Sequence, residues 1–365
     1  MAEVLFPSAN YGAAFVAPRA PRTHRLVWDR HPPDLHRYWR PLDGLALRRP
    51  GRSFDLMHTF NGVPLTSRPF VVTYESALPR TYGRGRYTAQ RLLRDRLLRD
   101  NCRSVIAISE YARRRMRTFN AGWADLDAVE ARTEVVHPNL PLRRTTPKTW
   151  DGKRVDLLFV GRQWARKGGV VAVRIARKAR ERGLPVHVTI VSPLVHGSAV
   201  YTDAPDADYA ADRALLDAPN VTVHERLPND EVVALMAAST LTLLATVHDT
   251  YGFSVLEGFS TGTPAVASRI GALPEVVQHG VNGLLLDAPL DADGDWTRVH
   301  DRTWDALDPV YESFADQAIE GIEALLAAPE RYEAMSAAAI ARIRDHHEAD
   351  AVGARLEEIY SRALA

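Results

Sequence analysis

The feature that most constrains the fold is an alternation of short β-branched runs with longer helical patterns, which occurs twice along the 365 residues. Such an alternation predicts parallel strands that are joined by crossover helices. The predicted strands are 70–74, 104–108, 134–137, 155–160, 187–191, 221–223, 241–245 and 265–268. The predicted helices are 88–99, 110–119 and 170–182, and two long helical segments run from Phe314 to the end of the chain.

A polar, proline-containing stretch at 143–152 separates the two series and is typical of a linker between domains. We therefore predict an α/β protein of two Rossmann-like, doubly wound domains that face each other across a cleft. The first covers residues 1–145 and the second covers residues 154–345, and a C-terminal helix near 346–365 could pack back on the first. Ligands of such sheets bind beyond the carboxyl ends of the strands, so we expect the chemistry in this cleft.

The composition is asymmetric between the two halves. Residues 1–150 hold 26 lysines and arginines against 13 acidic residues, whereas the rest of the chain holds 20 against 32. The single cysteine, Cys102, excludes an intramolecular disulfide and favours a reducing compartment. We expect no signal peptide in the first residues, and no apolar run reaches the roughly 18 to 20 residues of a membrane span. We expect a cytoplasmic protein and leave open a peripheral contact at the inner membrane face.

An acidic motif in the second half points to an anionic ligand. The segment 248–264 follows an apolar run, turns at Gly252 and enters a helix near Phe253. A helix N-terminus that is reached through such a turn offers backbone N–H groups and a positive dipole end to a phosphate. Asp249 lies on the loop and Glu257 lies in the first turns of the helix. Taken alone, the same pattern also fits a loop acid and a helix acid without any ligand.

A basic motif in the same half has the complementary charge. In the segment 159–169 a strand end is followed by Arg162, Lys167 and glycines, and then by a helix. Arginine can hold a diphosphate by forked hydrogen bonds, and lysine can hold it as a point charge. A solvated basic loop is the plain alternative. Because both motifs stand at strand ends in one half, a shared anionic ligand is favoured.

Five motifs, in their order along the chain, resemble the family-4 retaining glycosyltransferases, which have the GT-B fold and an E-x7-E motif. They lie within residues 106–110, 136–139, 160–168, 249–257 and 262–283. The resemblance is strong over 155–286, fair over 104–142 and weak before that. It implies an N-terminal domain on the acceptor side and a C-terminal domain that binds a nucleotide sugar.

The resemblance also implies roles for single residues. Glu257 would bind the ribose hydroxyls of the donor nucleotide, and Asp249 would lie at the transferred sugar. Arg162 and Lys167 would bind the diphosphate and stabilise the charge that develops as it leaves. The backbone N–H groups near the sugar and the diphosphate would be those of Gly252, Phe253, Ser254 and Val255.

The reaction implied by the resemblance is transfer of a hexose, with retention of configuration, from a nucleotide diphosphate sugar to a glycan, lipid or small molecule. Protein cations would neutralise the diphosphate, so we expect no metal and no further cofactor. Two alternatives stay open: a GT-B phosphorylase or epimerase, and a non-catalytic protein that binds a sugar nucleotide. Release of nucleoside diphosphate only in the presence of an acceptor would separate them from a transferase.

The acceptor side departs from the family pattern. The first acid of the E-x7-E motif is Asp249, which reaches one methylene less far than glutamate. In place of a glycine-rich turn there are only Tyr11 and Gly12, which we take as acceptor-side candidates. Where the family often has a histidine, this chain has Glu75, which could be a general base or a surface acid. His58 is a further candidate, with a structural role as its alternative.

The basic half contains arginine clusters at 84–87, 91–99 and 113–117. They could contact an anionic membrane, bind an acidic acceptor, or form solvated helix faces. We expect no nucleic acid as a partner, because no aromatic-rich or groove-reading motif accompanies the charge.

Overall fold

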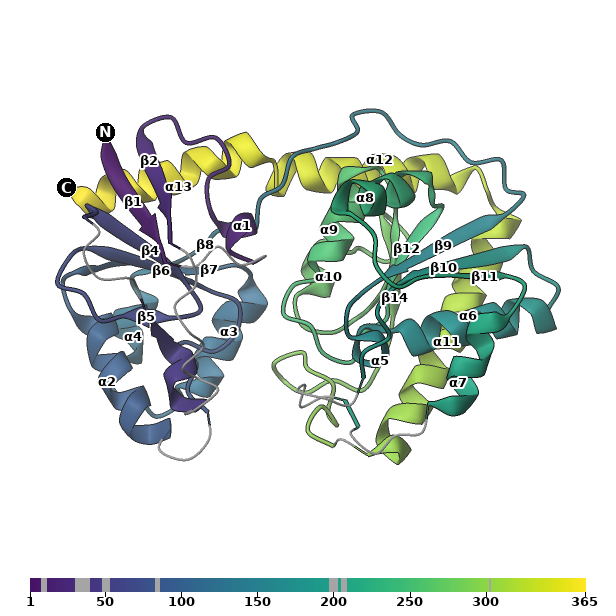
Figure 1. Ribbon diagram of the computed structural model, residues 1–365, viewed down its shortest axis with the longest axis horizontal. Coiled ribbons are helices and arrows are strands. Elements are labelled where there is room, and N and C mark those ends of the chain that lie inside the picture. The colour runs from purple at the N-terminus through teal and green to yellow at the C-terminus, as the bar shows by residue number, and fades with distance from the viewer. Residues whose placement is uncertain are drawn as a thin grey trace. The chain divides into compact units, whose positions relative to one another are not determined.

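The structure is a computed structural model of the chain, and it describes residues 1–7, 12–29, 40–47, 53–82, 86–196, 203–204, 209–301 and 303–365. The chain divides into two compact units (Figure 1). Unit 1 consists of Met1–Pro141 together with His346–Ala365, and unit 2 consists of Leu142–Asp345. Each unit contains a six-stranded sheet.

The sheet of unit 1 has the strand order β2-β1-β4-β6-β7-β8, and every neighbouring pair is parallel. Its strands are β1 (Ala2–Phe6), β2 (His24–Trp28), β4 (Leu56–Phe60), β6 (Phe70–Tyr74), β7 (Cys102–Ala107) and β8 (Thr133–Val135). A separate parallel pair joins β3 (Leu45–Ala46) to β5 (Val63–Pro64). The helices of this unit are α1 (Ala13–Val16), α2 (Arg86–Leu98), α3 (Glu110–Phe119), α4 (Leu126–Glu130) and α13 (Ala349–Leu364).

Helix α13 belongs to unit 1 although it ends the chain. It packs on one face of the sheet, while α2, α3 and α4 lie on the other (Figure 1). Its apolar residues recur at the helical spacing that makes a single stripe, and they are buried against the sheet: Leu356, Ile359, Tyr360 and Ala363. The Glu357 carboxylate also accepts hydrogen bonds from the backbone N–H groups of 22–24. These contacts fix the C-terminal helix to the start of the chain.

The sheet of unit 2 has the strand order β11-β10-β9-β12-β13-β14, again with parallel neighbours throughout. The strands are β9 (Val155–Val160), β10 (Val186–Val191), β11 (Val221–His224), β12 (Leu241–Leu244), β13 (Ala265–Ser268) and β14 (Gly283–Leu286). The helices are α5 (Trp164–Lys167), α6 (Gly169–Glu181), α7 (Ala210–Ala214), α8 (Asn229–Ala238), α9 (Phe253–Ser260), α10 (Leu273–Val276), α11 (Trp304–Ala327) and α12 (Arg331–His346).

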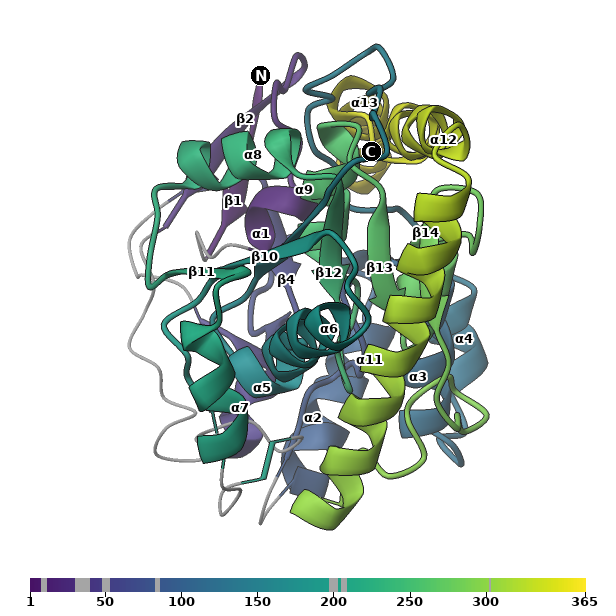
Figure 2. The same cartoon turned by 90° about the vertical axis from the view of Figure 1, so that its right-hand side faces the viewer.

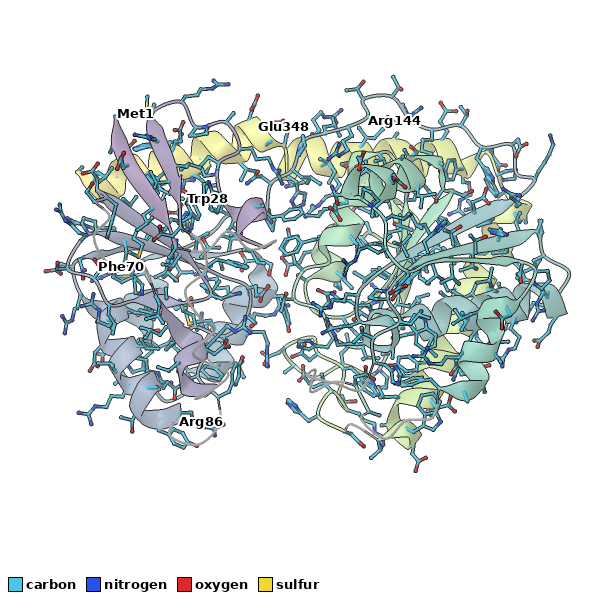
Figure 3. The ribbon with its side chains drawn as sticks, viewed as in Figure 1. Met1, Trp28, Phe70, Arg86, Arg144 and Glu348 are labelled. Carbon is cyan, nitrogen blue, oxygen red and sulfur yellow. The ribbon has the colours of Figure 1, made fainter. Side chains whose placement is uncertain are left out.

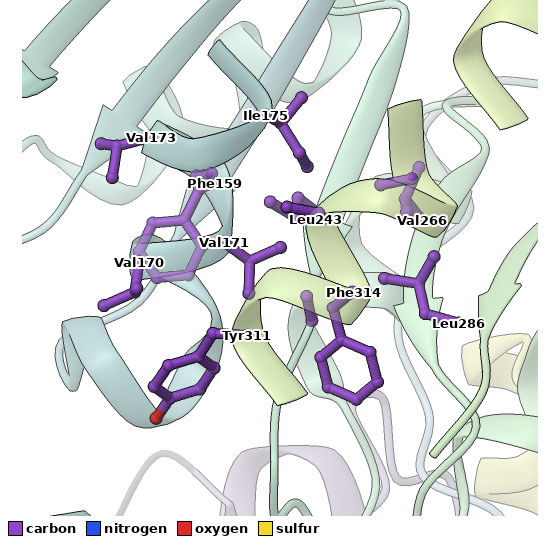
Figure 4. Close-up of a cluster of buried hydrophobic side chains, with 14 of the residues drawn as sticks. Phe159, Val170, Val171, Val173, Ile175, Leu243, Val266, Leu286, Tyr311 and Phe314 are labelled. Atoms are coloured by element: carbon purple, nitrogen blue, oxygen red, sulfur yellow. The ribbon is translucent and has the colours of Figure 1, made fainter. Parts of the chain in front are cut away.

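Helices cover both faces of this second sheet. Helices α6 and α11 pack side by side on one face, and α8 and α9 lie on the other (Figures 1 and 2). Between the sheet and the first pair lies the larger hydrophobic core (Figure 4), which includes Phe159, Val171, Leu243, Tyr311 and Phe314. A central strand that is buried on both faces has a nearly continuous apolar sequence, which explains residues 157–160 of β9.

The predicted fold class is confirmed, because both units are α/β with parallel, helix-covered sheets. Helix 110–119 and strand 155–160 have the predicted bounds. The prediction of two C-terminal helices is wrong, because three are present, and α11 begins ten residues before Phe314, at Trp304. A proline inside a pattern usually ends or kinks a helix, yet α11 continues through Pro309.

Candidate functional site

The candidate site lies in unit 2, on the loops that follow two neighbouring strands. Strands β9 and β12 pair in parallel, so their carboxyl ends meet at the same edge of the sheet. The loop after β9 runs through Arg162 into α5, and the loop after β12 carries Asp249 into α9. The basic motif and the acidic motif are therefore brought together, although their charged residues are 82 positions apart.

The two loops are joined by several hydrogen bonds. The Lys167 ammonium donates to Oδ2 of Asp249. The Arg166 guanidinium donates to the carbonyl of His248 and to the side chain of Gln163. The carbonyl of Arg166 in turn accepts from the N–H of Val247 at 3.2 Å. Arg166 thus holds the acidic loop at two points, and this hold keeps Asp249 beside Lys167.

A glycine permits this close approach of the two loops. Gly168 has a φ of +100°, and a Cβ at this position would lie 2.6 Å from the carbonyl oxygen of Ala245. Any larger residue would strain the backbone and push the loops apart. The glycine that follows the basic pair in the sequence is therefore explained by the geometry of the site.

Asp249 is charged in this environment. Its side chain is 8% exposed, and burial by itself would raise the pKa of the carboxyl group. The positive charges of Lys167 and Arg166, with a 3.3 Å hydrogen bond from the N–H of Tyr251, outweigh the burial and lower the pKa of Asp249 to about 2. The Lys167 side chain is 26% exposed. A ligand anion can therefore reach the lysine, while the carboxylate lies deeper.

The turn into α9 forms the remaining wall of the site. Gly252 has a φ of +88°, and a Cβ there would lie 2.5 Å from Cδ2 of Leu273. No side chain caps the helix at this residue. Phe253, Ser254 and Glu257 are half-buried, whereas Val255 faces the core. Helix α9 follows the Asp249 loop directly, so the positive end of its dipole lies at this loop. The N–H of Val255, one of the predicted donors to the ligand, is bonded back to the carbonyl of Gly252 at 2.9 Å.

The residues of the basic motif are not equivalent. Arg162 is exposed at the start of the loop, whereas Arg166 is half-buried and bonded across to the acidic loop. The sequence analysis selected Arg162 and Lys167 and missed Arg166, Gln163 and His248. The consecutive pair Arg166-Lys167 before two glycines was the available indication. Which member of that pair faces the carboxylate depends on the short helix α5.

In unit 1, the structure places Glu75 in a local network. Its Oε1 accepts from the Asn61 side chain at 2.9 Å and from Arg80 at 3.1 Å, and its N–H donates to Asn61 Oδ1 at 3.0 Å. Asn61 itself has a positive φ of 61°. The Glu75 carboxylate therefore stabilises the turn after β4 and pairs with Arg80, and its predicted role as a general base stays a prediction.

His58 does not offer a ligand site in this structure. Its side chain is fully buried, and its ring nitrogens are bonded to Tyr360 and Thr73, each at 2.7 Å. Burial lowers the pKa of His58 to about 3, so the ring is neutral and joins β4 to α13. Its assignment as an acceptor-side residue is corrected on this ground, because no ring atom reaches the surface.

The other acceptor-side candidates lie at the entrance to α1. Gly12 precedes this helix with a φ of −64°, a right-handed conformation that does not require glycine. Tyr11 lies outside the described residues.

Over the described part of the chain, no group of three or more histidine, cysteine or acidic side chains could hold a metal ion. No helix in that part combines the length and apolar character that crossing a bilayer requires.

The domain that carries these loops is similar to a known family. Residues 154–297 match the family model of glycosyl transferases group 1. This segment is therefore similar to the group 1 glycosyltransferases. A D-inositol 3-phosphate glycosyltransferase of Thermobispora bispora is 30% identical over 248 residues, which are 64% of this chain and 51% of that protein. The chain thus spans about half the length of this curated relative.

The solved structures show the fold of the whole chain. A glycosyltransferase from Rickettsia africae superposes with a TM-score of 0.64 and 13% identity, covering 100% of this chain and 98% of that one. HepE from Anabaena, in complex with UDP and glucose, gives a TM-score of 0.63 and 13% identity, covering 99% of this chain and 100% of that one. The two Rossmann-like units of the chain are those of the GT-B fold.

Proposed function

We propose that this protein is a retaining glycosyltransferase that moves a hexose from a nucleotide diphosphate sugar to a glycan, lipid or small-molecule acceptor. One observation carries the proposal. A buried carboxylate, Asp249, is paired with a partly exposed cation, Lys167, at the sheet edge where Gly252 leads into α9. Cleavage of a sugar nucleotide requires positive charge at the diphosphate and a hydrogen-bond acceptor at the sugar, and this edge offers both.

We assign the donor as follows. Lys167 and Arg162 bind the diphosphate, together with N–H groups of the α9 entrance, and they stabilise the charge that develops on the leaving group. Glu257 binds the ribose, and Asp249 binds hydroxyls of the sugar. Neutralisation by protein cations makes the reaction independent of metal. UDP is the first nucleotide to test, because HepE is described in complex with UDP and with UDP-glucose.

We further propose that unit 1 contacts an anionic membrane through the exposed face of α2. Tyr87 is 70% exposed and Leu92 is 52% exposed, and they lie among the exposed arginines 86, 91 and 99, of which Arg86 begins the helix (Figure 3). Exposed apolar side chains between basic residues favour an anionic lipid surface.

Sedimentation with phosphatidylserine vesicles tests the membrane contact. We expect Leu92→Glu to weaken the binding of the protein to these vesicles. Phosphatidylcholine vesicles should bind neither the wild type nor Leu92→Glu.

The donor assignment is tested by thermal unfolding with UDP, GDP, ADP and dTDP in the presence of excess EDTA. A ligand at a hundred times its dissociation constant stabilises the folded state by about 2.7 kcal/mol, which raises the Tm by a few degrees. We expect one nucleotide to act alone. If none raises the Tm of the folded protein, the donor site is wrongly assigned.

The reaction class is tested by nucleotide release. A transferase releases nucleoside diphosphate only when an acceptor is present, and each turnover yields one glycosylated acceptor. A phosphorylase would require phosphate, an epimerase would return an isomeric sugar nucleotide, and a non-catalytic binding protein would release nothing. Loss of turnover in Glu257→Ala, with the Tm retained, would place the nucleotide at α9.

A further inference from the structure

We infer that Asp249 competes with the terminal phosphate of the nucleoside diphosphate for Lys167, so that the site holds the intact sugar donor in preference to the spent nucleotide. The inference rests on the proposed function, because it takes Lys167 as the diphosphate ligand. It adds a role in product release to the carboxylate.

The first step concerns Lys167, whose ammonium already has a partner. In the structure it donates to Asp249 Oδ2. An incoming diphosphate must therefore share the ammonium with the carboxylate or displace it. The ammonium is a single point charge on a flexible stem, and with 26% of its side chain exposed it can turn toward a ligand.

The second step concerns Asp249, which cannot move away. Its loop is held by Arg166, whose guanidinium binds the His248 carbonyl and whose own carbonyl accepts from Val247. On the other side, Oδ1 accepts from the N–H of Tyr251, a fully buried residue. The carboxylate therefore stays within reach of Lys167 and pairs with it again when the ligand leaves.

The third step is the charge of the ligand before and after transfer. In the sugar donor, the distal phosphate is esterified and carries one negative charge. After the glycosidic bond to it has broken, this phosphate is terminal and carries about 1.5 to 2 charges at neutral pH. The additional charge appears close to a fixed carboxylate in a partly buried site, where like charges repel strongly. The intact donor instead offers sugar hydroxyls, which can donate to the same carboxylate.

The test is the affinity for UDP, measured by titration calorimetry in EDTA for the wild type, Asp249→Asn and Asp249→Glu. We expect Asp249→Asn to bind UDP about tenfold more tightly, a change of about 1.4 kcal/mol, and to bind UDP-glucose no more tightly than the wild type. Asp249→Glu keeps the charge and should bind UDP as the wild type does. Asp217→Asn, at an exposed residue of the 3-10 turn Leu215–Asp217, is the matched control and should change nothing.

Inorganic pyrophosphate is the second probe, because it reports the cation site without a base or a ribose. Tighter binding of pyrophosphate by Asp249→Asn supports the same conclusion. Unchanged or weaker UDP and pyrophosphate binding in a folded Asp249→Asn protein overturns the inference and leaves the proposed donor site standing. If neither the wild type nor Asp249→Asn binds UDP, GDP, ADP, dTDP or pyrophosphate, the proposed function fails, and the inference fails with it.

Discussion

The two units share one architecture but use the carboxyl ends of their strands differently. Both sheets are parallel, have six strands and are covered by helices on both faces. In unit 2 the ionisable residues after β9 and β12 pair with each other across two loops, and Lys167 stays partly exposed. In unit 1, His58 is enclosed in the core and Glu75 is bonded to its own neighbours. In this protein, Asp249 and Lys167 form a candidate site because two loops meet there and solvent reaches the lysine, whereas His58 lies inside β4 and Glu75 is bonded to its own neighbours.

The strongest test of this comparison removes the cation of the pair. Lys167→Met leaves the carboxylate of Asp249 buried without its main counter-charge, and we expect a loss of about 3 kcal/mol in the free energy of unfolding. Urea unfolding of the variant measures this loss. The double variant Lys167→Met, Asp249→Asn should recover most of it.

Lys153 supplies the control for this experiment. It is 83% exposed and pairs with Asp151 at the surface. Surface pairs of this kind contribute little, so Lys153→Met should leave the unfolding midpoint nearly unchanged. Equal losses from Lys153→Met and Lys167→Met would mean that the pair in unit 2 is an ordinary surface pair.

The backbone of the site provides the next test. Gly252→Ala must place a Cβ in a left-handed conformation and 2.5 Å from Leu273, so we expect a loss of about 2 to 3 kcal/mol. Gly183→Ala is the matched control, because its φ is +67° but nothing lies within 4 Å of the added atom. It should cost about 1 kcal/mol. If urea unfolding gives equal losses, the contact with Leu273 does not fix the turn.

For unit 1, the test is the pH dependence of stability. The unfolded chain protonates His58 near its usual pKa of 6.5, whereas the folded protein keeps it neutral down to about 3. Its contribution is complete above pH 6.5 and falls with decreasing pH, by up to about 1.4 kcal/mol per pH unit. His58→Gln should therefore show a flatter decline between pH 6.5 and 4 than the wild type, as measured by urea unfolding. If the free energy of unfolding falls equally with pH in the two proteins, His58 is in contact with solvent in the folded state.

The smallest expected effect is that of Glu75→Gln. Its Oε1 is held by Arg80 and Asn61, and glutamine retains an oxygen that can accept both bonds. We expect transfer rates within about threefold of the wild type and an unchanged pH profile, since loss of a general base would cost about 10²- to 10⁴-fold. A loss of that size, with the alkaline limb of the pH profile displaced, would assign base catalysis to Glu75 and make unit 1 a catalytic partner of unit 2.

The local elements could be predicted because their causes are local. The mostly apolar run 155–160 predicted the bounds of β9, and the helical pattern after the strand 104–108 predicted the start of α3 at Glu110. The Asp249–Glu257 spacing and the Gly252 turn indicated an anion site for the same reason, since a turn and a helix entrance are short-range features. The strands β1, β2, β4 and β14 were not predicted; the resemblance is weak where the first three of them lie.

By itself, the sequence determined the alternation of strands and helices, the glycine turn before α9 and the presence of opposite charges in one half of the chain. The tertiary structure decided which charges meet. It bonded Arg166 rather than Arg162 to the acidic loop and enclosed His58 between β4 and α13. The physical reason is distance along the chain: Lys167 and Asp249 are 82 residues apart, and His58 and Tyr360 are 302 apart. Only the pairing of strands that are remote in sequence brings such side chains within a hydrogen bond of each other.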